Sequence, residues 1–138
     1  MKTNLFYYPY LQPLKPGNIW GTANNLQYDF LQSLYRIIED NIDNPLLNVE
    51  FLATNMAVSK STLNRRLSIY LGVTAHQVIK QYRLQKAAIL LTAGKNVSET
   101  AYLTGFETPS YFIQCFKEFY KVTPKVYSKC NNPFIRVA

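Results

Sequence analysis

The chain has 138 residues, of which 48% are hydrophobic, and its 15 Lys and Arg outnumber its 8 Asp and Glu to give a net charge of +7. This size allows one or two small packed subdomains, and no apolar run approaches the ~20 residues that a membrane-spanning helix needs. The N-terminus also lacks the continuous apolar stretch of a signal peptide, so we expect a cytoplasmic protein with no membrane partner.

Residues 1–25 are rich in Tyr, Pro, Asn and Gly and show no sustained hydrophobic period, which predicts an N-terminal arm or linker. A helical period begins at Leu26 and should end after Asp40, before Pro45. The residues expected on the inner face of this helix are Leu26, Phe30, Leu34, Ile37 and Ile38.

Three cap signals follow. Asn48 is expected to cap a short helix through Asn55, and Ser59 a second helix that ends at Gly72. Thr74 then caps a longer helix to about Ala93. The second of these helices should bury Leu63, Leu67 and Tyr70.

A similar series occupies the rest of the chain. Asn96 or Ser98 opens a short helix to Thr104, and Thr108 caps a helix with proline at its first position, where a missing N–H has no cost. Thr123 and Pro124 open a last helix that should end near Lys129. Because no strand pattern appears, the predicted fold class is all-α.

The two series repeat each other at an offset of 49 residues. The matched pairs are Leu63 and Phe112, Leu67 and Phe116, Val73 and Val122, Thr74 and Thr123, and Val78 and Tyr127. Each copy has the outline of a helix-turn-helix, whose second helix fits the DNA major groove. In such a unit a small residue is followed four positions later by a Gly in the turn; Ala101 and Gly105 fit this spacing, whereas Ala57 stands where Gly is expected after Ala53.

The excess positive charge lies on the repeated region. Residues 46–130 contain eleven basic and four acidic side chains, and the rest of the chain is neutral overall. Such a distribution favours a polyanion-binding surface, although a solvated basic face would give the same count.

The two units resemble an AraC/XylS-type DNA-binding domain over about residues 28–129. The first half of the resemblance is carried by Leu52-Ala53, Ser59-Lys60-Ser61-Thr62-Leu63-Asn64-Arg65-Arg66-Leu67, Gly72-Val73-Thr74 and Tyr82-Arg83-Leu84-Gln85-Lys86-Ala87. The second half is carried by Val97-Ser98-Glu99-Thr100-Ala101, Gly105-Phe106, Ser110-Tyr111-Phe112, Phe116-Lys117 and Val122-Thr123-Pro124-Lys125-Val126-Tyr127. Two positions depart from the family pattern: Lys121 stands where Gly is usual and should strain the helix end, and Gln114 stands where Arg is frequent.

The resemblance implies a homeodomain-like fold of about seven helices, with two helix-turn-helix subdomains joined by a long linker helix. The expected divisions are an arm over 1–25, a domain over 26–130 and a tail over 131–138. Within the domain we expect one helix-turn-helix over about 48–71, the linker helix over about 75–92, and the other helix-turn-helix over about 97–120. The linker would be roughly 26 Å long, against about 34 Å between adjacent major grooves on one face of B-DNA.

Helical periodicity and the resemblance together suggest residues that contact DNA. Arg65 can bond guanine, and Asn64 and Gln114 can each pair with adenine through two hydrogen bonds. The expected base contacts are Ser61, Asn64, Arg65, Ser110, Tyr111 and Gln114. The expected backbone contacts are Ser59, Lys60, Arg66, Thr74, Thr108, Lys117 and Thr123. For Tyr111 a packing role is the alternative, and the four cap hydroxyls would be helix caps in either case.

These observations predict a bacterial transcription regulator that binds specific double-stranded DNA. The family resemblance implies an activator, with RNA polymerase as its partner. The chain resembles both a stand-alone regulator and the output part of a larger sensor-regulator, whose sensor or receiver part would then be a partner. The alternatives are a protein-interaction module on the same scaffold and a sequence-blind architectural DNA binder. We expect no enzyme activity, cofactor or metal: Cys115, Cys130 and the single His76 show no ligand spacing, and no catalytic constellation appears.

Overall fold

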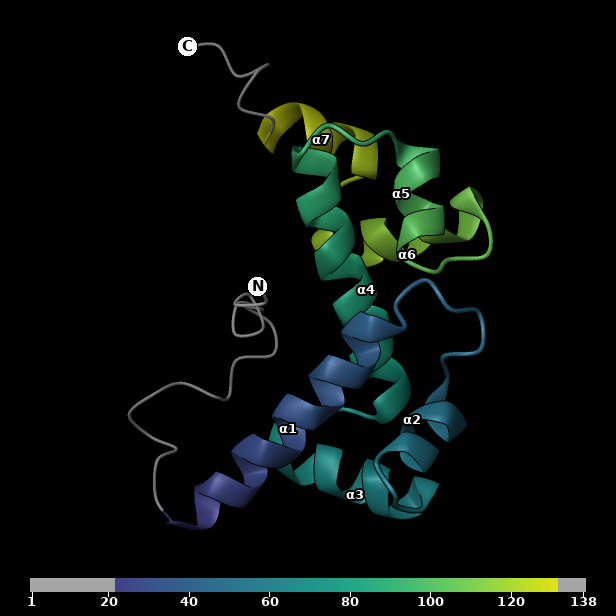
Figure 1. Ribbon diagram of the computed structural model, residues 1–138. Helices are drawn as coiled ribbons and strands as arrows, with labels where there is room; N and C mark the ends of the chain where they lie inside the picture. The colour runs from purple at the N-terminus through teal and green to yellow at the C-terminus, as the bar shows by residue number, and fades with distance from the viewer. Residues whose placement is uncertain (1–21, 132–138) are drawn as a thin grey trace. The chain divides into compact units, whose positions relative to one another are not determined.

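The computed structural model describes residues 22–131, which form seven helices and no strand (Figure 1). The predicted all-α class is therefore confirmed for this part of the chain. The helices are α1 (Thr22–Asp40), α2 (Val49–Asn55), α3 (Lys60–Leu71), α4 (Ala75–Thr92), α5 (Val97–Leu103), α6 (Pro109–Tyr120) and α7 (Pro124–Asn131). The arm expected before residue 22 and the tail expected after residue 131 lie outside the described residues.

The described residues divide into two compact units. The first contains residues 22–41 and 46–79, and the second contains residues 42–45 and 80–131. Helix α4 belongs to both, because its residues up to Ile79 are part of the first unit and those from Lys80 are part of the second.

Local capping determines where most helices begin. Side chains of Asn48, Ser59, Asn96 and Thr108 each accept a hydrogen bond from the backbone N–H three residues later, as predicted. At α4, Thr74 and Gln77 cap each other: the Gln77 N–H donates to Thr74 Oγ1, and the Thr74 N–H donates to Gln77 Oε1.

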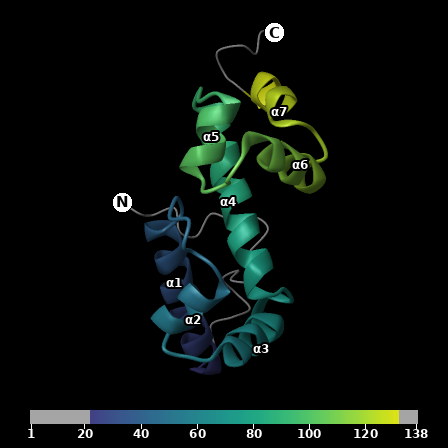
Figure 2. The same ribbon diagram turned by 90° about the vertical axis from the view of Figure 1, so that its right-hand side faces the viewer.

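The core of the first unit corrects the face predicted for α1. This helix begins at Thr22, four residues before Leu26, and Leu26 itself is 74% exposed. Its buried residues are Leu31, Leu34, Tyr35 and Ile38, so the true face includes two residues that the prediction omitted. Leu63 and Leu67 of α3 are fully buried as expected, whereas Tyr70 is half-buried and packs edge-on against Phe30. Figure 2 shows α1, α2 and α3 of this unit from a second direction.

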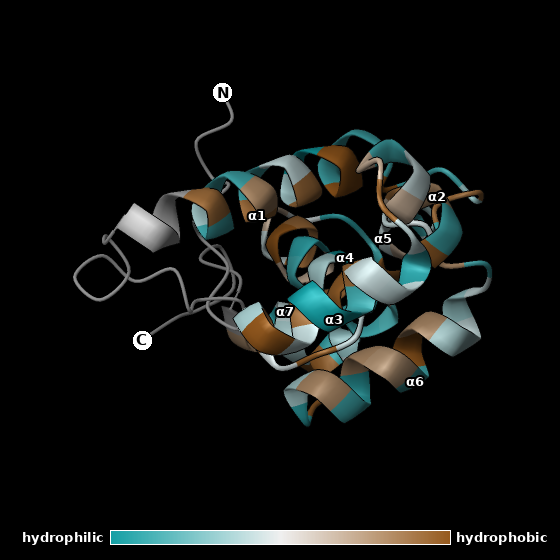
Figure 3. Cartoon of the chain, turned by 90° about the horizontal axis from the view of Figure 1, so that it is seen from below, coloured by the Kyte–Doolittle hydropathy of each residue, from teal (hydrophilic) through white to brown (hydrophobic). Residues whose placement is uncertain are grey.

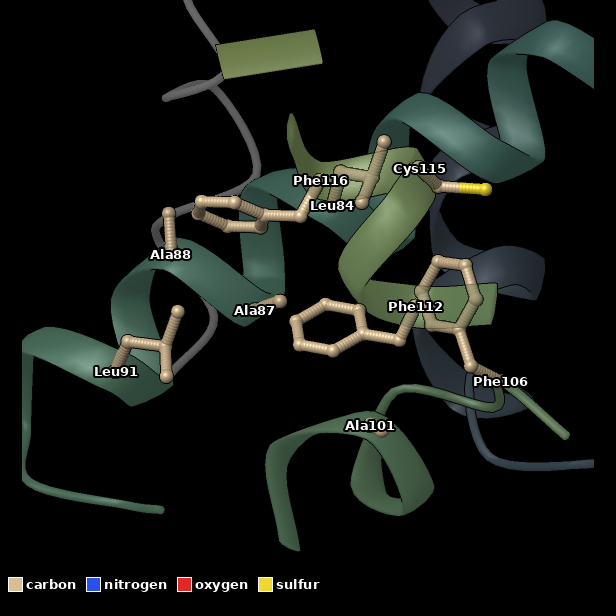
Figure 4. Close-up of a cluster of buried hydrophobic side chains, with 9 residues drawn as sticks. All are labelled: Leu84, Ala87, Ala88, Leu91, Ala101, Phe106, Phe112, Cys115 and Phe116. Carbon is tan, nitrogen blue, oxygen red and sulfur yellow. The ribbon is translucent and has the colours of Figure 1, made fainter. Parts of the chain in front are cut away.

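The core of the second unit is built mainly from α4 and α6. Its buried residues are Leu84, Ala87, Ala88, Leu91, Ala101, Phe106, Phe112, Cys115 and Phe116. Figure 4 shows the rings of Phe112 and Phe116 projecting from α6 toward α4. The rings of these two phenylalanines also meet each other at 5.6 Å, and both side chains are fully buried.

The turns of the two helix-turn-helix units have the same backbone hydrogen bond and a left-handed residue at the same place. In the first turn the Val58 N–H donates to Ala53 O at 3.0 Å, and in the second the Phe106 N–H donates to Ala101 O at 2.9 Å. Ala57 has φ 60° and Gly105 has φ 87°, so the first unit holds an alanine in the left-handed region that glycine adopts freely.

Helices α3 and α6 are the second helices of the two helix-turn-helix units and are called the recognition helices below. At their ends the glycine is in the first unit and the non-glycine residue is in the second. Gly72 ends α3 with φ 74°, and Lys121 ends α6 with φ 70°. The expected strain at Lys121 is therefore present as a left-handed, non-glycine cap, which costs about 1 kcal/mol or more.

No described helix is both long enough and apolar enough to cross a membrane. Figure 3 shows hydrophilic and hydrophobic residues interspersed along α1 and α6, as expected for helices that bury one face.

Candidate nucleic-acid interface

Helix α3 exposes the residues predicted for base contact, with one exception. Ser59 closes the first turn of the helix by accepting from the Thr62 N–H at 3.1 Å, so α3 starts at Lys60. Ser61 and Arg65 are both exposed, one turn apart on the same face. Both side chains are presented to solvent.

Asn64 is the exception, because it does not lie free on the exposed side of α3. It is half-buried, and its Oδ1 accepts a hydrogen bond from the Ala75 N–H at 2.8 Å. That N–H belongs to the first residue of α4, which has no partner within its own helix. Asn64 therefore satisfies a buried helix end, a tertiary role that helical periodicity alone did not predict.

Arg66 makes a contact within the first unit that the sequence did not predict. Its guanidinium lies over the Phe30 ring at 5.1 Å from the centroid, and the Phe30 ring in turn meets Tyr70 edge-on at 5.6 Å. A guanidinium in this position is attracted by the electron-rich face of the ring. The side chain thus helps to pack α3 against α1.

Helix α6 presents the second set of predicted residues. Thr108 accepts from the Tyr111 N–H at 3.1 Å, and Pro109 occupies the first helical position as expected. Ser110, Gln114 and Lys117 are exposed on the free face of the helix. The structure therefore brings these side chains onto one surface of the second unit.

Tyr111 packs against its own unit and is also partly exposed. Its ring packs against Phe106 at 6.0 Å, yet the residue remains 47% exposed. A side-chain hydrogen bond with Cys115, followed by the charge of that thiol, partial burial and the charge of Glu118, raises the pKa of Tyr111 above its ordinary value. The phenol stays protonated at neutral pH, so it remains able to donate a hydrogen bond.

The four predicted anchor hydroxyls all act as helix caps. Besides Ser59 and Thr108, Thr74 accepts from the Gln77 N–H at 3.2 Å and Thr123 from the Val126 N–H at 3.3 Å. The remaining first-turn N–H groups of these helices give each N-terminus a partial positive charge, which suits a phosphate. Lys60 and Lys117 are exposed and add full positive charges to the two recognition helices.

Arg83 has a structural role that the sequence did not predict. The residue is half-buried; its Nε donates to Ile42 O at 3.2 Å and its Nη2 to Asn44 O at 3.4 Å. Burial lowers the pKa of Arg83 below its ordinary value. Arg83, Ile42 and Asn44 all belong to the second unit, so the hydrogen bonds of Arg83 hold the segment 42–45 in place within that unit. No local signal identifies such a contact between residues about forty positions apart.

The described part of the chain contains no group of three or more His, Cys, Asp or Glu side chains that could hold a metal ion. Cys115 is buried in the core of the second unit, and both Cys130 and His76 are exposed.

Comparisons with known proteins agree with this geometry. The family model described as "Helix-turn-helix domain" matches residues 52–129. Histidine kinase P4 of Formosa agariphila is 32% identical over 107 residues, covering 77% of this chain and 8% of the kinase. Transcriptional activator PerA of Escherichia coli is 35% identical over 78 residues, covering 56% of this chain and 28% of PerA. The chain therefore spans less than a third of the length of either relative.

A solved structure gives the same answer for the fold. The C-terminal domain of AraT, a response regulator from Geobacillus stearothermophilus, matches with a TM-score of 0.69 and 26% identity, covering 75% of this chain and 86% of that domain. This chain has two helix-turn-helix units with matching turns, and the family model covers more than half of its length. Together these findings show that the chain belongs to the AraC-type helix-turn-helix family of transcription regulators.

Proposed function

We propose that this chain binds specific duplex DNA by placing α3 and α6 in successive major grooves. The observation that carries the proposal is the matched pair of capped recognition helices, each with hydrogen-bonding side chains on its exposed face. A major groove accepts a helix of this kind. The connecting helix α4 has 18 residues, which corresponds to about 27 Å, and this is comparable with the repeat of the groove.

Each exposed residue has a proposed role set by its chemistry. Arg65 bonds guanine O6 and N7 in the site of the first unit, and Gln114 pairs with adenine in the site of the second. Ser61, Ser110 and Tyr111 make shorter-range or water-mediated contacts beside them. The proposed phosphate contacts are Ser59, Lys60, Thr74, Thr108, Lys117 and Thr123. Arg66 is not included in this set, because its guanidinium is placed on Phe30.

Regulation is proposed from the relatives. One of them is named as an activator, which supports activation through RNA polymerase. Another is a much longer histidine kinase, which supports an output domain controlled by a sensor or receiver part. Binding to chromosomal DNA would place the activity in the bacterial cytoplasm.

The test is the replacement of Arg65 by Ala, with Arg36→Ala as the matched control. Both arginines are exposed and carry the same charge, but Arg36 lies on α1, outside the recognition helices. On the preferred DNA site, Arg65→Ala should weaken binding by about 5- to 150-fold, corresponding to roughly 1–3 kcal/mol for a bidentate base contact. On random duplex DNA it should lose much less, and Arg36→Ala should change both affinities little.

Two other results would contradict the proposal. An equal loss on preferred and random DNA would assign Arg65 to the backbone and favour architectural binding. An affinity that hardly changes with salt would favour a protein-interaction module, because phosphate contacts make binding fall steeply as ionic strength rises.

A further inference from the structure

Asn64 of α3 accepts a hydrogen bond from the first residue of α4, Ala75. The Ala75 residue that Asn64 binds is fully buried, so its N–H has no access to water. The Thr74–Gln77 cap satisfies the N–H groups of its own two members and leaves that of Ala75 unpaired. A buried N–H without a partner costs about 1–3 kcal/mol, so the Asn64 side chain has a clear stabilising role.

The second unit shows what happens when this N–H is absent. At the same offset of 49 residues, Ile113 stands in place of Asn64 and Pro124 in place of Ala75. Proline has no backbone N–H, and Pro124 is the buried first residue of α7. In the first unit the start of α4 has an N–H donor, and Asn64 supplies the acceptor. In the second unit the start of α7 has no N–H donor, and the matching residue, Ile113, is apolar.

The bond also limits what Asn64 can do at DNA. Bidentate pairing with adenine uses both the amide oxygen and the amide nitrogen of asparagine. Here one lone pair of the oxygen is already used inside the protein, and the residue is half-buried. Pairing of Asn64 with adenine would therefore have to use the second lone pair of an oxygen whose direction is fixed by the bond from the Ala75 N–H.

We propose that Asn64 is a positioning residue, which fixes the recognition helix α3 against the N-terminus of α4 and does not read a base. The inference rests on the proposed function, since it says which residues of α3 carry sequence preference. In this account Arg65 and Ser61 read bases, and Asn64 acts by holding the helix that carries them.

Three variants test the inference: Asn64→Asp, Asn64→Ile, and the double variant Asn64→Ile with Ala75→Pro. Aspartate keeps the acceptor and suits a helix N-terminus, but it loses the NH₂ donor that adenine pairing needs. The double variant transfers the second unit's residue pair to the first, and proline is well tolerated at a first helical position. Thermal unfolding is measured without DNA, and binding is measured on the preferred site and on each of its single-base-pair variants.

The expected result is a Tm lowered by about 5 °C in Asn64→Ile, with most of the loss recovered in the double variant and little loss in Asn64→Asp. The order of preference among DNA sites should be unchanged in all three. A wild-type Tm for Asn64→Ile would show that the bond between Asn64 and Ala75 does not stabilise the protein, and it would overturn the inference. Loss of preference at one base pair in Asn64→Asp or in the double variant, with Tm retained, would make Asn64 a base-reading residue. If the wild-type chain prefers no site, the proposed function fails, while the order of the Tm values still decides whether Asn64 and Ala75 form the junction.

Discussion

Ala57 and Gly105 occupy the same place in the two helix-turn-helix turns, and both have left-handed backbone, with φ 60° and φ 87°. Their surroundings differ. Ala57 is exposed, whereas a Cβ added to Gly105 would collide with Ile42 O and lie 2.7 Å from Arg83 Nε. The two positions therefore predict opposite responses to exchanging alanine and glycine.

Ala57→Gly should stabilise the protein. The substitution releases the steric cost of a left-handed alanine, about 1–2 kcal/mol, and adds chain entropy to the unfolded state worth about 0.4–1 kcal/mol. The expected net gain in the free energy of unfolding is about 0.5–1 kcal/mol, measured by urea denaturation. A loss of stability would show that the alanine side chain makes a favourable contact in the turn.

Gly105→Ala should destabilise the protein by about 2–4 kcal/mol, because it adds a collision with backbone to the left-handed strain. Gly94→Ala is the matched control: Gly94 has φ 99°, and its added Cβ would meet nothing within 4 Å. The control should therefore lose only the strain component. Equal losses for the two variants would mean that the Arg83 and Ile42 segment moves away without cost.

Lys121→Gly should stabilise the end of α6 by about 1 kcal/mol, since Gly72 shows that the equivalent cap of α3 is made by glycine. Lys121→Ala is the control, because it removes the same charge and keeps the left-handed strain. Thermal unfolding should rank the glycine variant above the wild type and the alanine variant no higher than the wild type. Stabilisation by both substitutions would point to charge repulsion instead of backbone strain.

Arg66 should contribute mainly to stability, in contrast to its neighbour Arg65. A double-mutant cycle with Arg66→Ala and Phe30→Leu should give a coupling energy of about 0.5–1 kcal/mol, as expected for a cation over an aromatic ring. Arg66→Ala should also weaken DNA binding less than Arg65→Ala does. Additive effects in the cycle, combined with a large loss of DNA affinity, would restore the phosphate contact predicted from the sequence.

The cap residues were predictable because their interactions are local. Ser59 and Thr108 each bond an N–H only three residues away, so residue type and helical period suffice to identify them. The left-handed turn at Ala57 was predictable for the same reason, once its spacing from Ala53 matched that of the second unit.

Asn64, Arg66 and Arg83 show where the sequence was insufficient. Their partners lie 11, 36 and about 40 positions away, at Ala75, Phe30 and the Ile42–Asn44 segment. Periodicity assigns a residue to a face of its helix but does not show which neighbouring element covers that face. Periodicity therefore could not show that Asn64 and Arg66 make contacts within the fold, and their contacts with DNA remain predictions.

The prediction that Leu26 lies on the inner face of α1 was wrong for a related reason. It continues the apolar period of α1, but at 74% exposure it lies beyond the part of the helix that packs on the core. Tyr35 was omitted although it is 2% exposed, because its position does not follow the chosen period.

The most direct test of the central claim is selection of binding sites from a random duplex library at physiological salt, using residues 1–138. Readout by both units predicts an enriched motif with two blocks about one helical turn apart. A single block that Arg65→Ala abolishes would mean that α6 holds the backbone and does not read bases. No enriched motif, with binding that depends only on salt, would contradict sequence-specific recognition by this chain.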